Sequence, residues 1–275
     1  MSLKALEFFS KYIEQETGIV FHESNLYQLQ SRLEEIAKLE NKTGLDELLL
    51  SFQRGPDLKT KQRLLDHSTN NETLFFRDPA FFEAIIDFVK NTILPMNPPE
   101  IKIWSAASST GQEALSAAIT LDELSQKVKM PNFKILGTDI CQRALDKAKS
   151  GLYTDFEMMR GLSEERKKKY FTQGPRGWQA NAKLMGHVSF QYNNLLSSTV
   201  SDSFHLILCR NVLIYMKVET KRQCVESLLS RLDPNGGLIL GVGETLMGVT
   251  DKVKTTLQNK VIIYRKIGYQ DKLAA

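Results

Sequence analysis

The stretch IKIWSAASSTGQEALSAA, residues 101–118, begins as a short apolar run and continues as a helical pattern. The same order recurs at 132–150 and 204–232, where runs rich in Ile, Leu and Val precede helical patterns. Alternation of buried strands with helices is typical of βαβ units around a parallel sheet. Two further apolar runs, at 236–244 and 260–266, add strands. The sequence therefore predicts an α/β fold for this part of the chain.

Residues 1–66 have a different pattern, which is helical throughout. Apolar residues recur at helical spacing over 3–13 and 26–39, and Arg-Gly-Pro at 54–56 marks a turn. This segment carries nine Lys and Arg against eleven Asp and Glu, so it is slightly acidic. We predict two domains: a small all-α domain over 1–66 and a larger α/β domain over 67–275.

An unusual segment separates the second and third predicted core strands. It reads GPRGWQANAKLMGHVSFQY and spans residues 174–192. Its glycines and the alternation of HVSFQY at 187–192 are typical of a small antiparallel hairpin rather than of another βαβ unit. We therefore expect an antiparallel β insert at about 172–192.

Composition excludes several classes of protein. The 275 residues are 42% hydrophobic and 25% charged, which is ordinary for a globular protein, and no run is long and apolar enough to span a membrane. The start of the chain is an amphipathic helical pattern with acidic residues rather than a signal peptide. The net charge of +4 is too small to predict a nucleic-acid partner. Cys141, Cys209 and Cys224 are widely spaced, which favours a reducing setting without disulfides or structural zinc. We expect a cytoplasmic monomer with no membrane insertion, no bound metal and no nucleic-acid partner.

Ligands of open α/β sheets bind beyond the carboxyl ends of the strands, so the residues that follow each strand are the candidates for a site. After the first strand, SAASSTGQE at 105–113 is a run of small residues that would let the backbone approach a ligand, although a tight turn explains it equally well. After the second strand, Asp139 could bind a ribose diol or could be only the N-cap of the next helix. The third strand ends near Arg210, Asn211 and Tyr215. Asn211 could also cap a turn, and Tyr215 could be a packing residue.

The type of cofactor follows from these loops. A loop with a glycine after the first strand, combined with an acid after the second, indicates a cofactor that carries a nucleoside. The chain lacks the Gly-x-Gly-x-x-Gly fingerprint of dinucleotide sites, which favours a cofactor without a pyrophosphate. S-adenosylmethionine is such a cofactor.

The chain resembles a known family through five motifs in order. They are NNETLFFRDPAFF (70–82), IWSAASSTGQEALSAA (103–118), ILGTDICQRALDKAKSGLYT (135–154), CRNVLIYM (209–216) and GGLILGVGETL (236–246). In this order they resemble the CheR-type chemotaxis receptor protein-glutamate O-methyltransferases, over nearly the whole chain. The resemblance implies a Rossmann-like methyltransferase domain with a small antiparallel β insert that contributes to docking, preceded by an all-α domain. It also implies methylation of glutamate side chains on the cytoplasmic helical bundle of chemoreceptors, with S-adenosyl-L-homocysteine as the product.

The same resemblance implies roles for individual residues. It places catalysis or substrate holding at Arg77 and Tyr215. It implies cofactor contacts at Asn71, Thr73, Arg77, Glu113, Asp139, Asn194, Leu195, and around Arg210 and Asn211. The first loop departs from the family's usual GCSTGEEPYS at several positions, but it keeps Glu113.

The stretch NNETLFFRDPAFF combines hydrogen-bonding side chains with aromatic ones. Phe75 and Phe76 would line or support a dry wall of the site, or simply pack in the core, and at least one of them is expected in the core. Phe81 and Phe82 are expected in the core as part of the next helix.

Two other functions remain open at this point. A methyltransferase acting on a different acceptor, such as a nucleic-acid base, would use the same cofactor. The chain lacks the Asn/Asp-Pro-Pro-aromatic loop typical of enzymes that methylate adenine, and ERKKKY at 165–170 is typical of a solvated helix face. A non-catalytic module that binds S-adenosylmethionine is the other alternative, and the altered first loop motivates it.

Overall fold

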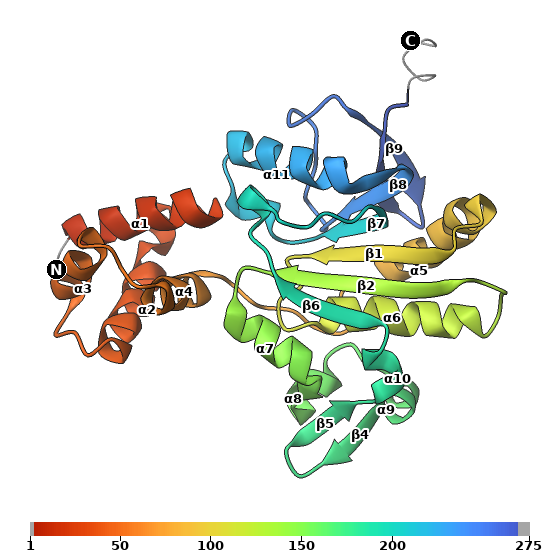
Figure 1. Ribbon diagram of the computed structural model, residues 1–275, viewed down its shortest axis with the longest axis horizontal. Helices are drawn as coiled ribbons and strands as arrows, with labels where there is room; N and C mark the ends of the chain where they lie inside the picture. Colours follow the sequence, from red (N-terminus) through yellow and green to blue (C-terminus); the bar gives the residue numbers. More distant parts are fainter. Residues whose placement is uncertain (1–2, 269–275) are drawn as a thin grey trace.

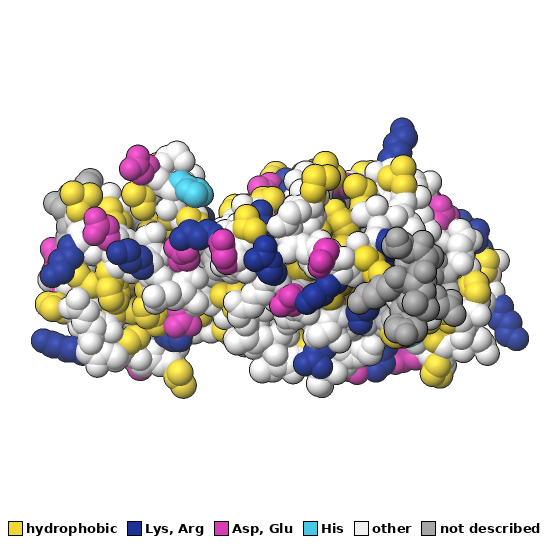
Figure 2. Space-filling model, turned by 90° about the horizontal axis from the view of Figure 1, so that it is seen from above, with side chains coloured by type: hydrophobic (Ala, Val, Ile, Leu, Met, Phe, Trp, Pro, Cys, Tyr) yellow, Lys and Arg dark blue, Asp and Glu magenta, His cyan; other side chains and the backbone are white. Residues whose placement is uncertain are grey.

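The computed structural model describes residues 3–268, so residues 1–2 and 269–275 of the predicted domains lie outside the described part. Four helices form a lobe of their own beside a sheet flanked by helices (Figure 1), and a notch separates the two lobes in the space-filling view (Figure 2). The first lobe contains α1 (Leu3–Thr17), α2 (Leu26–Leu39), α3 (Leu45–Gln53) and α4 (Leu58–Ser68). Their apolar stripes pack on one another around Phe9, Leu33 and Leu48, none of which is exposed.

A seven-stranded sheet forms the centre of the second lobe, in the order β6-β2-β1-β7-β8-β10-β9. Its strands are β1 (Glu100–Ala106), β2 (Asn132–Asp139), β6 (Val188–Tyr192), β7 (Phe204–Cys209), β8 (Leu232–Leu240), β9 (Val253–Gln258) and β10 (Val261–Lys266). The pairs from β6 to β8 are parallel, and the two pairs made by β10 are antiparallel. This arrangement confirms the predicted α/β fold and brings the carboxyl ends of five strands to one edge.

Helices cover both faces of the sheet because successive side chains of each buried strand point to opposite faces. Ile101 and Ile103 of β1 pack in the cluster that contains α5 (Pro79–Phe88) and α6 (Gln112–Ser125). Trp104 and Ala106 pack in the cluster on the other face, which contains α11 (Val218–Arg231). Strands buried on both faces read as continuous apolar runs, which is why the sequence identified them.

The antiparallel insert begins and ends earlier in the chain than predicted, and it has three strands rather than the two of a hairpin. It is a three-stranded sheet of β3 (Leu152–Tyr153), β4 (Phe171–Gly174) and β5 (Gly177–Ala180). Helices α8 (Asp155–Met159) and α9 (Glu164–Tyr170) lie between β3 and β4, while α7 (Gln142–Ser150) precedes β3 and α10 (Ala182–Met185) follows β5. The prediction that residues 187–192 belong to this hairpin is wrong, because β6 pairs in parallel with β2 at the edge of the main sheet.

A packing contact explains the position of β6. A Cβ atom at Gly137 would lie 2.5 Å from the ring of Phe190, so the glycine in β2 makes room for this side chain. Alternation of apolar and polar residues is typical of an edge strand as well as of a hairpin, and the sequence could not separate them. Strand β9 was not predicted, because its sequence, VKTTLQ, is largely polar.

Candidate functional site

One pocket lies at the carboxyl edge of the parallel strands, where the helical lobe meets the sheet. It encloses about 990 Å³ of space not filled by atoms, including its mouth. All ten predicted site residues line it: Asn71, Thr73, Arg77, Glu113, Asp139, Asn194, Leu195, Arg210, Asn211 and Tyr215. They come from the loop before α5, from α6 and from the ends of β2, β6 and β7. The sheet topology thus brings together residues up to 144 positions apart, from Asn71 to Tyr215.

Asp139 ends β2 and is buried at the base of the pocket. One carboxylate oxygen accepts the backbone N–H of Ser109 at 2.7 Å and the other accepts that of Cys141 at 2.9 Å. Burial raises the pKa of the Asp139 carboxyl above its usual range, while these N–H groups act to lower it. A carboxylate has about four acceptor positions, so Asp139 can accept a further hydrogen bond, as from a hydroxyl group of a ribose.

The N-cap alternative for Asp139 is wrong. Helix α7 begins at Gln142, so the N-cap position belongs to Cys141. The backbone N–H of Gln142 is instead accepted, at 2.8 Å, by the carboxylate of Asp66 in α4. Helix α4 therefore satisfies the start of α7 from the other lobe, and the carboxylate of Asp139 is directed at the loop after β1.

The loop after β1 is held in a strained conformation. Ala107 and Ser109 have φ of 66° and 51°, a region that non-glycine residues rarely adopt and that is enriched at functional sites. The hydroxyl of Ser109 donates to the carbonyl of Asn71 at 2.7 Å, and this contact ties the loop to the segment before α5. The next turn requires Gly111, at φ 92°, because a Cβ atom there would lie 2.9 Å from Ala148. Small residues are therefore needed here for packing as well as for access.

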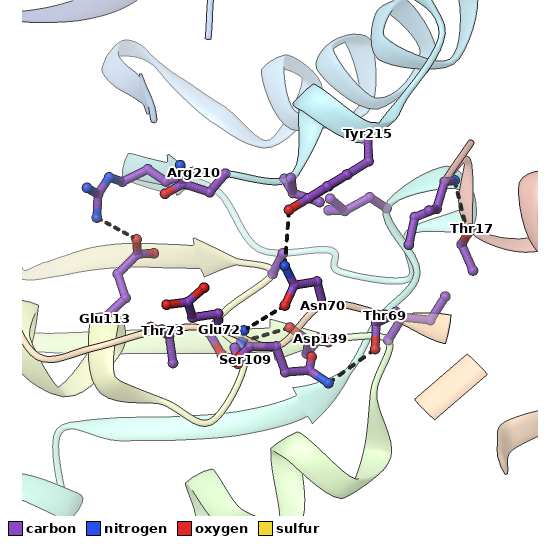
Figure 3. A pocket seen from close by; sticks show the side chains of 18 of the residues that line it. Thr17, Thr69, Asn70, Glu72, Thr73, Ser109, Glu113, Asp139, Arg210 and Tyr215 are labelled. Atoms are coloured by element: carbon purple, nitrogen blue, oxygen red, sulfur yellow. Dashed lines mark hydrogen bonds and ion pairs between the residues drawn. The ribbon is translucent and has the colours of Figure 1, made fainter. Parts of the chain in front are cut away.

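Arg210 holds the opposite side of the pocket together, as Figure 3 shows for its contact with Glu113. Its side chain is 3% exposed and makes ion pairs with Asp78 and with Glu113, the latter at 3.1 Å. It also donates to the backbone carbonyl of Arg77 at 3.1 Å, and it stacks on Phe81 at 4.0 Å from the ring centroid. The guanidinium is thus occupied by groups of the protein itself.

Arg77 has the opposite character. Its guanidinium makes one long hydrogen bond of 3.5 Å, to the backbone carbonyl of Glu72. No ion pair or ring contact of this side chain occurs within residues 3–268. Of the two arginines that line the pocket, Arg77 is therefore the one whose charge is available to a ligand.

Tyr215 is fixed at both ends. Its hydroxyl accepts a hydrogen bond from the amide of Asn70 at 3.3 Å, as drawn in Figure 3. Its backbone carbonyl accepts the N–H of Val20 at 2.9 Å. The side chain lines the pocket, so it is more than a packing residue.

The N-terminal lobe supplies part of the pocket wall, as the family resemblance implies, through residues that the sequence did not single out. Thr17 and Ile19, at the end of α1, line the pocket. Asn194 donates to the carbonyl of Glu16 at 2.7 Å, so this predicted site residue is also a link between the lobes. Contacts between segments this far apart leave no trace in local periodicity.

Three buried polar atoms of the pocket have no hydrogen-bond partner within the described chain: Ser108 Oγ, Asn193 Nδ2 and Arg210 Nε. Orphaned buried groups are rare in native proteins and require an explanation. A polar ligand in the pocket would provide one. Ser108 and Asn193 were not predicted as site residues, although Ser108 lies in the small-residue loop after the first strand and Asn193 precedes the predicted Asn194.

The aromatic residues of the loop before α5 belong to the core. Phe75 and Phe76 are both buried and neither lines the pocket, so the prediction that at least one packs in the core is confirmed for both. Phe81 and Phe82 are buried in the same cluster, also as predicted, and Phe82 in addition lines the pocket. Of these four phenylalanines, only Phe82 therefore contributes to the apolar wall of the pocket.

Three other features of the described residues concern predictions from the sequence or bear on the chemistry. No group of three or more His, Cys, Asp or Glu side chains among them is arranged to hold a metal ion. No helix among residues 3–268 combines the length and apolar character needed to cross a membrane. The three cysteines are buried and free.

Comparison with known proteins adds a family. Residues 71–262 match the family described as "CheR methyltransferase, SAM binding domain". The chain is 37% identical over 263 residues to the chemotaxis protein methyltransferase of Vibrio anguillarum, with 94% of each chain covered. It is 36% identical to that of Vibrio parahaemolyticus, again over 94% of each chain. It is 34% identical to the chemotaxis protein methyltransferase Cher2 of Pseudomonas putida, over 96% of this chain and 99% of the relative.

Proposed function

The chain belongs to the CheR methyltransferase family, and we propose that it methylates glutamate side chains on the cytoplasmic helical bundle of a chemoreceptor, forming methyl esters. The cofactor is S-adenosylmethionine, and the broader role is methylation in chemotaxis. The glutamate acceptor, the roles of individual residues and action as a monomer in the cytoplasm are parts of the proposal.

The residues of the pocket fit this cofactor. Asp139 would bind the ribose hydroxyls, and the orphaned Ser108 Oγ and Asn193 Nδ2 would gain partners. Three carboxylates and two guanidinium groups line the pocket, an excess of negative charge that suits a cation: Glu72, Glu113, Asp139, Arg77 and Arg210. When bound, S-adenosylmethionine supplies a methyl group on a positively charged sulfur.

The absence of a histidine from the pocket is consistent with an acceptor that needs no general base. None of the four histidines of the chain lines the pocket. A glutamate side chain, with an ordinary pKa of about 4.3, is already ionised at neutral pH and needs no proton removed. The protein must then orient the acceptor and exclude water, and good orientation of two reactants is worth about 7–11 kcal/mol.

The observation that carries the proposal is the contrast between the two arginines. The charge of Arg210 is paired with Asp78 and Glu113, whereas Arg77 makes one long hydrogen bond to a carbonyl. A free guanidinium fork in an otherwise acidic pocket is suited to a carboxylate. We infer that Arg77 holds the acceptor glutamate, with the hydroxyl of Tyr215 as the second contact.

The test is transfer of labelled methyl from S-adenosylmethionine to a chemoreceptor cytoplasmic fragment. The expected product is a base-labile ester that releases methanol, and Arg77→Ala should lower kcat/KM by about 10–150-fold, the equivalent of about 1.5–3 kcal/mol for hydrogen bonds to a charged group. Arg77→Lys, which keeps the charge without the fork, should recover only part of this loss. Arg143→Ala is the matched control, because Arg143 is exposed and does not line the pocket.

Each alternative has its own outcome. Base-stable label would indicate a different acceptor. Calorimetric binding of S-adenosylhomocysteine without turnover would indicate a non-catalytic module. Equal activity of wild type and Arg77→Ala would remove Arg77 from the mechanism.

A further inference from the structure

We propose that Glu244 is a positioning residue for methyl transfer, which fixes the backbone of residues 211–214 and thereby the place of Tyr215. This inference rests on the proposed function for its kinetic consequence. Glu244 does not itself line the pocket, so it acts through the residues that do.

The carboxylate of Glu244 accepts hydrogen bonds from four backbone N–H groups. One oxygen accepts from Asn211 and from Gly241, both at 2.7 Å. The other accepts from Val212 and from Ile214, both at 3.2 Å. An ionised carboxylate has about four acceptor positions, so these bonds fill it. One side chain thus ties the turn after β8 to the loop after β7.

The turn after β8 is built for this contact. Gly241 has no room for a side chain, because a Cβ atom would lie 2.7 Å from Glu244 Oε2 and 2.9 Å from the backbone nitrogen of Asn211. Gly243 has φ of 85°, in the left-handed region that favours glycine. The N–H of Glu244 also donates to the carbonyl of Gly241 at 3.0 Å, closing the turn. Two glycines therefore direct one carboxylate into the neighbouring loop.

The loop that Glu244 holds would not keep its conformation unaided. Asn211 has φ of 58°, in the left-handed region, which is uncommon for residues other than glycine although Asn tolerates it better than most. The next residues form a single 3₁₀ turn, Leu213–Tyr215, which is too short to be stable alone. Asn211, Val212, Tyr215 and Met216 all line the pocket. Release of the four N–H groups would therefore move the pocket wall that carries Tyr215.

The test compares wild type with Glu244→Gln, which keeps the shape but turns one oxygen into a donor facing N–H groups. Displacement of a reacting group by about 1 Å can cost about 100-fold in rate, so kcat on the receptor fragment should fall 10–100-fold. KM for S-adenosylmethionine should rise by a smaller factor, because most of the expected cofactor contacts lie outside this loop. Gly241→Ala should reproduce this split. Glu226→Gln is the control, because Glu226 is an exposed carboxylate that pairs with Lys252 away from the pocket.

A second readout does not depend on the substrate. Amide hydrogen exchange of Asn211, Val212 and Ile214 should be at least 10-fold faster in Glu244→Gln, with the amide of Leu238 in β8 unchanged. If wild type fails to methylate the receptor, the proposed function falls, and the exchange data still judge the positioning of the loop. Unchanged exchange, or a kcat equal to that of wild type at temperatures well below unfolding, would overturn the role of Glu244.

Discussion

Substitution of Arg210 by methionine removes the charge that joins three parts of the pocket. The side chain is 3% exposed and is paired with Glu113, whose side chain is 12% exposed, and with Asp78, whose side chain is 39% exposed. Breaking a buried ion pair from one side costs about 3–5 kcal/mol, because the remaining charge is left without a partner. The contact with Asp78 contributes little to this cost, since water screens that carboxylate. We therefore expect the free energy of unfolding to fall by about 3 kcal/mol, most of it from Glu113.

Urea unfolding at neutral pH, followed by circular dichroism, measures this change. Glu113→Gln alone and the double variant Arg210→Met/Glu113→Gln complete a cycle, and the coupling should be about 1–3 kcal/mol because removal of both charges leaves neither one unpaired. Arg77→Met is the matched control and should stay within about 0.5 kcal/mol of wild type, since its guanidinium makes one long bond. A loss below 1 kcal/mol for Arg210→Met, or strict additivity in the cycle, would refute the assignment of Arg210 as the residue that holds the pocket.

Three further substitutions test other parts of the structure. Gly161→Ala should destabilise the protein by more than about 2 kcal/mol in urea unfolding, because φ is 86° and the new Cβ would lie 1.8 Å from the carbonyl of Phe75. The control is Gly55→Ala, where φ is 92° and the space around the new Cβ is open, so only the backbone penalty of about 1 kcal/mol is expected. Equal losses of stability in the two variants would contradict the clash. Burial acts to raise the pKa of the Asp122 carboxyl, but hydrogen bonds from a lysine and a tyrosine outweigh it and lower the pKa overall. The ionised carboxylate therefore stabilises the folded protein at pH values above the unfolded-state pKa of about 3.9. This stabilisation is lost as the pH falls through the lower pKa of the folded state. Asp122→Asn should therefore cost about 1–2 kcal/mol at pH 7 and progressively less below about pH 4, and a difference independent of pH would exclude this linkage. Ser108→Ala removes a buried hydroxyl that has no hydrogen-bond partner, so the thermal unfolding temperature without ligand should be unchanged or higher. Calorimetry should show that S-adenosylhomocysteine binds about 2–10-fold more weakly to this variant. Unaltered binding would show that the ligand does not use this hydroxyl.

Strands β6 and β9 show which features of the sheet could not be predicted from the sequence. Both are edge strands of the main sheet. Strand β6 was predicted as a strand but placed in the insert, because alternation does not say which neighbour a strand pairs with. Strand β9 is polar enough to read as a loop. Pairing partners are set by contacts between distant segments, such as that of Phe190 with Gly137.

The sequence by itself determined the α/β class, the helical N-terminal lobe and the residues that converge on the pocket. The class followed because buried strands are continuously apolar, and Asp139, Arg210 and Tyr215 followed because parallel strands present their carboxyl ends at one edge. The other site residues were implied by the family resemblance. Only the tertiary structure decided which arginine is free to bind a ligand, which carboxylate holds the loop of Tyr215, and that the end of α1 closes the pocket. These features depend on hydrogen bonds and ion pairs between segments far apart in the chain. A local pattern of residues therefore could not predict that Arg210 is neutralised by neighbouring carboxylates and that Arg77 is not.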